Sequence, residues 1–497
     1  MQLSVTVANP QDAKADLLVL VVDKGGDLFE TAHPDLVATV KELKEGIEAK
    51  RIKRELVLRA PAGVGARYVA FTSTELVRNL SREEALRALG GHAARLGRDM
   101  NLATVAFAAS GRDPVRAAAL LVEGAALAAY SFEKYRKQKR GYQDEVTLLV
   151  VLAPRRKDKK AEVSNACHDA LATCETINRC RDLVNEPGGV VFPETMAQAA
   201  RDIATRSGLQ CEVWEEEKLR EEGYNGLLQV GAGSHPRPPR LIVLRYRPRR
   251  GKASKSGAHL ALVGKGLTFD TGGISIKPAA NMWMMKGDMA GGAACLYAME
   301  VIARLKPAIP VTAIVPSSEN FPGPDAQRPG DIFIAKNGKS IHVDNTDAEG
   351  RLILTDGLFH AGREGATHIV DVATLTGSCV RALGTSIAGI MGTDRKLVNS
   401  VIGTGKEQGE NFWELPLHEE YRELIDFPIA DVNNVGGANA GAITAGLFLK
   451  EFVPEKAAWC HLDIAGTFIA EKPWKHYGPG ATGFAVKTLA RLALAFA

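Results

Sequence analysis

The sequence predicts an α/β protein with two domains: a smaller N-terminal α/β domain over residues 1–160, and a larger C-terminal α/β domain with a central mixed sheet over residues 161–497. Three observations support this prediction. The chain has 497 residues, which is too long for one ordinary hydrophobic core. Apolar runs alternate with segments that repeat apolar residues at helical spacing. A charged run, PRRKDKKAE at residues 154–162, is typical of a linker between domains.

The N-terminal domain alternates strands and helices in the way that is typical of a mostly parallel sheet covered on both faces. The predicted strands are LLVLVV, ARYVAFTS, LATVAFAAS and EVTLLVVLAP, at residues 17–22, 66–73, 102–110 and 145–154. Helical spacing is found between these strands over residues 82–97 and 115–132. After the linker, we expect a long amphipathic helix that starts near Ser164.

The C-terminal domain continues with buried-strand patterns, found at residues 241–246, 258–266, 309–316 and 366–374. Glycine-rich segments follow these strands, and nearly all unusual residues of the chain gather there. In open α/β sheets, ligands bind where strands end and the chain turns. We therefore expect the functional site at these strand ends.

The amino-acid composition limits the classes of protein to which the chain can belong. Hydrophobic residues make up 45% and charged residues 24%, and no stretch approaches the ~20 apolar residues of a membrane span. The N-terminus lacks the features of a signal peptide, so a cytoplasmic location is expected. The seven cysteines include no C-x-x-C pair, which favours reduced thiols.

The charge balance gives only a weak case for nucleic-acid binding. A net charge of +4 is small for this length, although basic runs occur at residues 135–140, 154–160 and 245–255. Basic loops are usually part of the solvated surface. DNA binding is therefore only a possible additional role of the protein, and retention on DNA at physiological salt would test it.

Several common catalytic motifs are absent from the sequence. There is no phosphate-binding loop of the G-x-x-x-x-G-K-[ST] type and no G-x-S-x-G nucleophile elbow. The nearest match to a zinc helix is HEEYR at residues 418–422, where Arg422 stands in place of the second histidine. The chemistry must then rest on carboxylates and lysines.

One candidate cluster is NTDAEGRL at residues 345–352, where Asp347, Glu349 and Arg351 occupy every second position. If the backbone is extended there, these side chains point the same way and converge. A solvated strand edge or turn explains the same residues when this segment is taken alone.

A second cluster lies in VGKGLTFDTGGISIKP (residues 263–278) and KGDMAGGAA (residues 286–294). The first segment supplies Lys265, Asp270 and Lys277 among glycines that allow tight turns, and the second supplies Asp288 at the mouth of a small-residue helix. Singly, each has an ordinary explanation as a turn former, a helix cap or a surface charge. All of them together are much harder to explain in that way.

Both clusters together supply four carboxylates, on Asp270, Asp288, Asp347 and Glu349. Four converging carboxylates repel one another strongly unless cations are present. A pair of divalent metal ions with a bridging carboxylate resolves that conflict. Lys265 could add a neutral amine, since a lysine next to a cation and away from water loses its proton readily.

These motifs resemble those of the leucine aminopeptidases, or cytosol aminopeptidases, which are dinuclear metallo-exopeptidases. The resemblance rests on VGKGLTFDTGGISIKP, MKGDMAGGAA and NTDAEGRL, with further similarity in LVNEPGG, DVATLTG, AGAITAGLFLKEF and HLDIAG. It spans about residues 180–490, which makes residues 161–497 the expected metallopeptidase catalytic domain. The N-terminal domain carries no motif of its own, and we expect it to be non-catalytic. One interpretation makes it an interaction module, whereas the hexameric assembly of the family implies that it projects from a core of packed catalytic domains.

The resemblance implies a role for each site residue. It implies that the ligands of the more exchangeable metal are Lys265, Asp270, Asp288 and Glu349. It implies that the second ion is held by Asp270, Asp347 and Glu349. The two non-ligand catalytic positions match Lys277 and Arg351. The positions that line the pocket for the first side chain or hold the peptide backbone match Met285, Thr374, Leu375 and Gly377.

The resemblance also implies the activity and the partners. The expected protein is a cytosolic leucyl aminopeptidase that acts on peptides with a free N-terminus, through a metal-bound water or hydroxide in a two-metal site. The expected cofactors are two divalent ions per subunit, Mn²⁺ or Zn²⁺, with a bicarbonate at Arg351 as proton acceptor. A homohexamer without a membrane association is expected. A dinuclear hydrolase of another ester or amide, such as a phosphoesterase, is the alternative enzyme.

Overall fold

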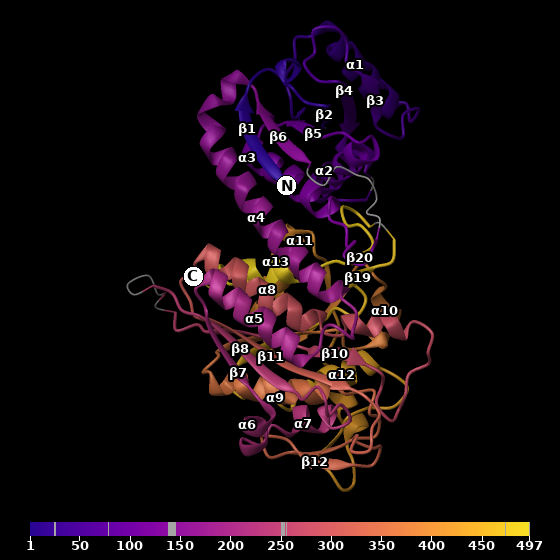
Figure 1. Ribbon diagram of the computed structural model, residues 1–497, viewed down its shortest axis with the longest axis vertical. Helices are drawn as coiled ribbons and strands as arrows, with labels where there is room; N and C mark the ends of the chain where they lie inside the picture. The colour runs from indigo at the N-terminus through magenta and orange to yellow at the C-terminus, as the bar shows by residue number, and fades with distance from the viewer. Residues whose placement is uncertain are drawn as a thin grey trace. The chain divides into compact units, whose positions relative to one another are not determined.

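The computed structural model describes residues 1–23, 26–77, 79–137, 146–249, 254, 256–472 and 474–496. The chain forms two compact units (Figure 1). The first consists of Met1–Asn178 and Ala470–Pro479, and the second of Arg179–Ile469 and Gly480–Ala497. The predicted boundary between residues 160 and 161 stays a prediction.

The first unit contains a mostly parallel six-stranded sheet in the order β1-β6-β5-β2-β4-β3. Its strands are β1 (Gln2–Val7), β2 (Leu17–Val22), β3 (Leu56–Arg59), β4 (Tyr68–Ser73), β5 (Thr104–Ala108) and β6 (Thr147–Leu152). Its helices are η1 (Pro10–Asp12), α1 (Pro34–Glu48), η2 (Thr74–Leu76), α2 (Arg82–Asp99), α3 (Pro114–Ala128) and η3 (Pro154–Lys159). Only the edge pair β3–β4 is antiparallel among these strands.

The strands and helices predicted for this unit are present, but the predicted linker is wrong in its conformation. Residues 154–159 form η3, and α4 (Lys160–Asn185) begins at Lys160 rather than near Ser164. Lysine, alanine and glutamate are good helix formers, so the charged run continues the helix backwards instead of interrupting it. The short edge strand β3 and the helix α1 had not been predicted.

Helices α2 and α3 pack at unusually short range because each has a glycine at the contact. A Cβ on Gly124 would lie 1.8 Å from the backbone oxygen of Arg87, and one on Gly90 would lie 2.0 Å from that of Leu121. The two helix backbones can therefore touch only because Gly124 and Gly90 carry no side chain.

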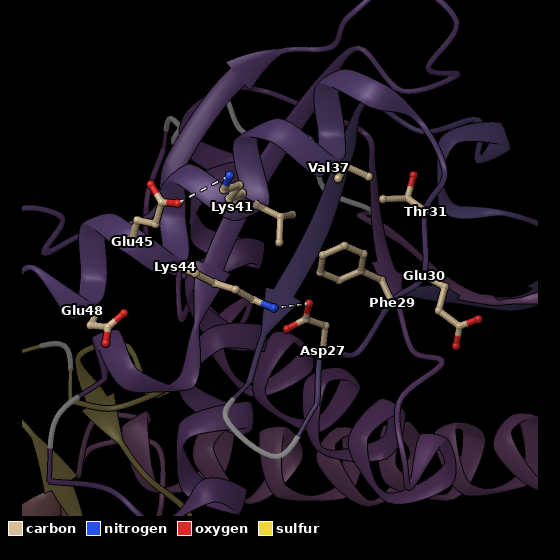
Figure 2. Close-up of a pocket in the computed structure, with 10 residues that line it drawn as sticks. Asp27, Phe29, Glu30, Thr31, Val37, Lys41, Lys44, Glu45 and Glu48 are labelled. Atoms are coloured by element: carbon tan, nitrogen blue, oxygen red, sulfur yellow. Dashed lines mark hydrogen bonds and ion pairs between the residues drawn. The ribbon is translucent and has the colours of Figure 1, made fainter.

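A cavity of about 540 Å³ lies between α1 and the segment that follows β2 (Figure 2). Its apolar lining includes Phe29 and Val37. At its rim, Lys44 Nζ lies 2.8 Å from Asp27 Oδ2. The charged groups at this rim are thus partly neutralised by one another.

The second unit contains a mixed nine-stranded sheet in the order β16-β15-β18-β14-β9-β11-β8-β7, with β10 paired to β11. Its strands are β7 (Gln210–Trp214), β8 (Arg240–Tyr246), β9 (Leu260–Gly264), β10 (Gly266–Asp270), β11 (Val311–Asn320), β14 (His368–Ala373), β15 (Ala388–Gly392), β16 (Phe412–Glu414) and β18 (Ala458–Asp463). The small sheets consist of β12 (Ile332–Ile334), β13 (Ser340–His342), β17 (Val432–Asn433), β19 (Ile469–Ala470) and β20 (Gly480–Ala481). The mixed sheet agrees with the predicted fold class.

Helices accompany the strands of this sheet along the chain. They are α5 (Pro193–Ser207), α6 (Glu216–Glu221), α7 (Asn225–Gly231), η4 (Met282–Gly287), α8 (Ala290–Leu305), α9 (Gly350–Arg363), α10 (Gly377–Leu383), α11 (Arg395–Gln408), η5 (Glu419–Ile425), α12 (Gly441–Lys450) and α13 (Val486–Leu492). Within the described ranges, each helix is too short or too polar to cross a lipid bilayer. All seven cysteines are free.

Three neighbouring strands, β9, β11 and β14, run in the same direction at the centre of the sheet. Their carboxyl ends therefore meet at one edge. The small residues that begin α8 permit this arrangement, since a Cβ on Gly291 would lie 2.1 Å from the backbone oxygen of Val372 in β14. The start of α8 thus packs closely against β14 because Gly291 has no side chain.

A buried acid joins α7 to α9. The Oδ2 of Asp356 accepts a hydrogen bond of 2.8 Å from the backbone N–H of Leu227, and its Oδ1 is buried without a hydrogen-bond partner. Burial raises the pKa of Asp356 to about 8, against the hydrogen bonds from α7, which lower it.

We expect Gly124→Ala to lower the free energy of unfolding by about 3 kcal/mol, because the added methyl group must push α2 and α3 apart. Gly403→Ala, in the exposed face of α11 where a Cβ meets nothing within 4 Å, is the control. It should be neutral or stabilising by about 0.5–1 kcal/mol. Urea unfolding followed by circular dichroism measures both. Equal stability of the two variants would contradict the close approach of α2 and α3.

We expect Asp356→Asn to flatten the pH dependence of stability. The pKa of Asp356 rises from 3.8 to about 8 on folding, so between these values the folded chain holds the extra proton. Stability due to this group is therefore present at low pH and is lost, by at most about 1.4 kcal/mol per pH unit, as pH rises towards 8. Urea unfolding at pH 5, 6, 7 and 8 compares variant and parent. Parallel curves would show that Asp356 does not carry this proton.

Candidate functional site

The candidate site lies where the central strands end. Lys265 follows β9, Asp270 is the last residue of β10, and Thr374 follows β14. The backbone N–H of Lys265 donates to the oxygen of Val372 at 3.0 Å, and its Nζ donates to the oxygen of Thr374 at 3.1 Å. The parallel register of β9 and β14 thus brings these residues together, although they are far apart in sequence.

Lys265 forms the buried half of the site with two carboxylates. Its Nζ lies 2.8 Å from Asp288 Oδ2 and 2.9 Å from Glu349 Oε1, and all three side chains are at most 7% exposed. Burial alone would lower the pKa of Lys265, but the negative charges of Asp288, Glu349 and Asp270 outweigh it and raise the pKa. A divalent cation in the same place would reverse that field and favour the neutral amine.

Lys277 forms the more open half with two further carboxylates. Its Nζ lies 2.7 Å from Asp270 Oδ2 and 2.6 Å from Asp347 Oδ1. The side chains of Lys277 and Asp347 are 21% and 32% exposed. Burial lowers the pKa of Lys277, and the charges of Asp270, Glu349 and Asp347 raise it by more, so this lysine is a cation.

The expectation of an extended backbone in NTDAEGRL is wrong. Asp347 lies in a turn, and Glu349 has the helical angles φ −78° and ψ −33° directly before α9. The acids still converge, because the turn and the start of the helix direct them to the same place. The alternative of a solvated turn is also wrong for Glu349, because this residue is only 1% exposed.

Two glycines make room for the charged side chains. A Cβ on Gly350 would lie 2.6 Å from Lys265 Nζ, and one on Gly272 would lie 2.8 Å from Asp347 Oδ1. Gly272 also has φ +88°, a conformation that residues with a side chain rarely adopt. Larger residues at either position would displace a charged group of the site.

Hydrogen bonds that had not been predicted hold two of the acids in place. Asn320 Nδ2 donates to Asp270 Oδ1 at 2.9 Å, and Thr374 Oγ1 donates to Asp288 Oδ1 at 2.6 Å. Asp463 accepts from the backbone N–H of Leu375 at 3.2 Å. Strand β11 was predicted to end at residue 316, but it extends to Asn320. The polar residues SSEN at the end of the strand were the signal that could have indicated Asn320 as a residue of the site.

Arg351 lies in the first turn of α9 and is buried. Its Nη1 donates to the backbone oxygen of Asn434 at 2.7 Å, while its Nε is buried without a hydrogen-bond partner. Burial lowers the pKa of Arg351 to about 10, so the guanidinium is still cationic at neutral pH. A cation with an unused N–H is a suitable ligand for a small anion.

The residues predicted to line the substrate pocket lie beside these groups along the chain. Met285 is half-buried in η4, three residues before Asp288. Leu375 is half-buried after β14, and Gly377 is exposed at the start of α10. Thr374 donates a hydrogen bond to Asp288, a contact that had not been predicted.

The donor set fits divalent cations. Oxygens of Asp270, Asp347 and Glu349 all lie within 4.8 Å of one another, and Glu349 Oε2 is buried without a hydrogen-bond partner. Burial, reinforced by Asp270, raises the pKa of Glu349 to about 8, even though Lys265 counteracts this. Buried carboxylates in such surroundings are stabilised by metal ions, and oxygen donors suit hard or borderline divalent ions.

Two of the three basic runs lie partly outside the described residues, at 138–140 and at 250–253 and 255. The third, residues 154–160, lies in η3 and at the start of α4. There Arg155 pairs with Glu30 and Lys159 with Glu162. DNA binding stays a prediction.

Comparison with known proteins gives the same family for both parts of the chain. Residues 178–490 match the cytosol aminopeptidase family, catalytic domain. Residues 19–139 match the cytosol aminopeptidase family, N-terminal domain.

Individual relatives agree with these matches. A probable cytosol aminopeptidase from Solibacter usitatus is 42% identical over 99% of both chains, and one from Geotalea uraniireducens is 45% identical over 74% of this chain and 73% of its own. Among solved structures, a tomato leucine aminopeptidase variant has a TM-score of 0.85 at 29% identity, covering 100% of this chain and 96% of its own. The bottromycin maturation enzyme BotP, in complex with Mn, has a TM-score of 0.82 at 31% identity, covering 97% and 99%. The chain therefore belongs to the cytosol aminopeptidase family and is a metal-dependent aminopeptidase, a hydrolase that removes N-terminal amino acids from peptides.

Proposed function

We propose that this aminopeptidase works through two divalent ions held by the carboxylate cluster at the strand ends. The observation that carries the proposal is the convergence of Asp270, Asp347 and Glu349 within 4.8 Å, next to the buried Lys265. Lys265, Asp270, Asp288 and Glu349 hold the first ion. Asp270, Asp347 and Glu349 hold the second. When bound, such ions lower the pKa of coordinated water towards ~7 and polarise a carbonyl oxygen.

The remaining groups bind different parts of the peptide in the two halves of the site. Asp288 lies in the buried half, where Thr374 fixes its carboxylate, and it would assist the binding of the substrate's N-terminal amine to the ion held there. Lys277 lies in the open half and keeps its charge, so it donates a hydrogen bond to the carbonyl oxygen of the bond to be cut. Met285, Leu375 and Gly377 lie near these residues in the chain and contact the first side chain and the peptide backbone.

Arg351 holds a bicarbonate ion in this proposal. Its unpartnered Nε and its lasting positive charge support this role. The carboxylates of the site are occupied as ligands, so an anion there supplies the proton acceptor that hydrolysis needs. The role of Arg351 is thus to hold and orient that acceptor.

The proposal also covers the identity of the two ions, the assembly of the chain and its location. The BotP structure holds Mn, and carboxylate-rich sites accept manganese or zinc according to supply. We propose Mn²⁺ or Zn²⁺ in this chain, a homohexameric assembly, and action in the cytoplasm on peptides with a free N-terminus.

Removal of metal should abolish the hydrolysis of leucine p-nitroanilide, and added manganese or zinc should restore it. An acetylated amino group should block cleavage, because Asp288 and its metal then lose the free amine. Chelated protein, checked by circular dichroism to be folded, is assayed with each ion and each substrate. Full activity in protein shown by mass spectrometry to be metal-free would refute the two-ion proposal.

Lys265→Arg should weaken metal binding by about tenfold or more, because a guanidinium does not lose its proton in proteins and cannot be a neutral ligand. Lys286→Arg in η4 is the matched control, since Lys286 Nζ donates to the oxygen of Asn185 and not to the carboxylate cluster. Metal content per subunit and its titration are measured by plasma mass spectrometry. If Lys265→Arg keeps full metal and activity, the assignment of Lys265 as a ligand is wrong.

A further inference from the structure

One buried asparagine contacts both ends of the segment 344–351, which contains two acids of the site. Asn434 is 0% exposed and directly follows the short strand β17. Its Oδ1 accepts hydrogen bonds from the backbone N–H of Asp344 at 2.9 Å and from that of Asn345 at 3.2 Å. Its backbone oxygen accepts a hydrogen bond of 2.7 Å from Arg351 Nη1. A single residue thus links the start of the segment to its end.

The side-chain amide of Asn434 is held on both sides. Its Nδ2 donates to the backbone oxygen of Asn345 at 2.7 Å, while its backbone N–H donates to the oxygen of His342 at 3.0 Å. An amide whose oxygen faces two N–H groups and whose nitrogen faces a carbonyl has one favourable orientation. Asn434 therefore fixes the backbone that leads into the turn before α9.

The backbone oxygen of Asn434 depends on these side-chain contacts for its position. Strand β17 ends at Asn433, the chain bends at Asn434, and it then continues through Gly436 and Gly437, which has φ +83°. The ladder of the small sheet consequently does not extend to this oxygen. The amide that is anchored to the 344–345 backbone holds it in place for Arg351.

The contact with Asn434 also sets the direction of the Arg351 guanidinium. This group is planar and carries its N–H donors in a fixed geometry. When Nη1 is tied to the oxygen of Asn434, the direction of the Nε–H follows. That Nε is buried without a hydrogen-bond partner, and in the proposed function it faces the anion that Arg351 holds.

We propose that Asn434 is a positioning residue of the reaction, which holds the guanidinium of Arg351 in the orientation that catalysis needs. This inference rests on the proposed function, in which Arg351 holds and orients the proton acceptor. Since the same amide fixes the start of the segment 344–351, it sets the place of the arginine relative to the acids. Asn434 acts through Arg351 and not on the substrate.

The test is a double-mutant cycle with Asn434→Ala and Arg351→Met, in which manganese-loaded enzyme cleaves leucine p-nitroanilide. Asn434→Ala should lower kcat by about tenfold to hundredfold with little change in KM, as is usual for residues that orient a group of the site. In the Arg351→Met enzyme the same substitution should have little further effect, because the group that Asn434 positions is gone. A merely structural role would lower activity in both backgrounds.

Two further variants complete the design. Asn433→Ala is the matched control, because the Asn433 side chain bonds with His342 and Val435 instead of the segment 344–351. Its kcat should stay near that of the parent enzyme. Asn434→Asp keeps an oxygen for the two N–H groups and loses the donor to the Asn345 oxygen, so it should show the same pattern with a smaller loss. It replaces Asn434→Ala in the cycle if circular dichroism shows that variant to be unfolded.

The outcomes separate this inference from the function on which it rests. If removal and addition of bicarbonate leave kcat of the parent unchanged, the proposed role of the anion fails, while the cycle still decides whether Asn434 positions Arg351. If the effects of Asn434→Ala and Arg351→Met multiply, or if Asn434→Ala keeps the kcat of the parent, the positioning proposal is overturned. A loss of bound manganese in Asn434→Ala, measured by plasma mass spectrometry, that accounts for its lost activity would also overturn it.

Discussion

Repulsion among buried carboxylates is the constraint on which the rest of the site depends. Two lysines face the carboxylates of Asp270, Asp288, Asp347 and Glu349, so negative charge remains in excess. Burial raises the pKa of Glu349 to about 8 and that of Asp288 to about 6, which shows how poorly the two lysines alone compensate the acids. In the function that we propose, divalent cations would remove this conflict.

Strand direction explains how the charges come to be so close. Parallel strands carry their carboxyl ends to one edge, and β9, β11 and β14 all do so. Polar residues can follow each strand without interrupting the core, which stays apolar along the strands themselves. Asn320 at the end of β11 links Asp270 to the turn before α9, because it donates hydrogen bonds to Asp270 and to the backbone oxygen of Thr346. One sheet edge thus positions both the acids and the turn that precedes α9.

The sequence was sufficient for those features that depend on local pattern. Apolar runs predicted the central strands β8, β9, β11 and β14 and four strands of the first unit, and the glycines after Lys265 predicted tight turns, which the positive φ angles of Gly272 and Gly273 confirm. Features that depend on tertiary contacts were not predictable in this way. The helical angles of Glu349 follow from α9, whose small first residue packs against the Lys265 side chain, and no short-range pattern indicates that. The conformation of the charged run at 154–162 was wrong for a related reason, since charge alone does not distinguish a linker from a solvated helix.

The unequal exposure of the two halves of the site explains why the enzyme takes one end of a peptide. Behind Asp288, the chain is closed by Thr374, whose backbone oxygen binds Lys265 and whose hydroxyl binds Asp288. A peptide segment continuing beyond the amine would have to displace these buried, charged contacts, and leaving such groups unpaired costs several kcal/mol. A free terminal amine needs no such room, and in the proposed function it would bind the ion that Asp288 helps to hold. In the proposed function, exclusion of internal peptide bonds therefore follows from the burial of the half of the site that contains Asp288.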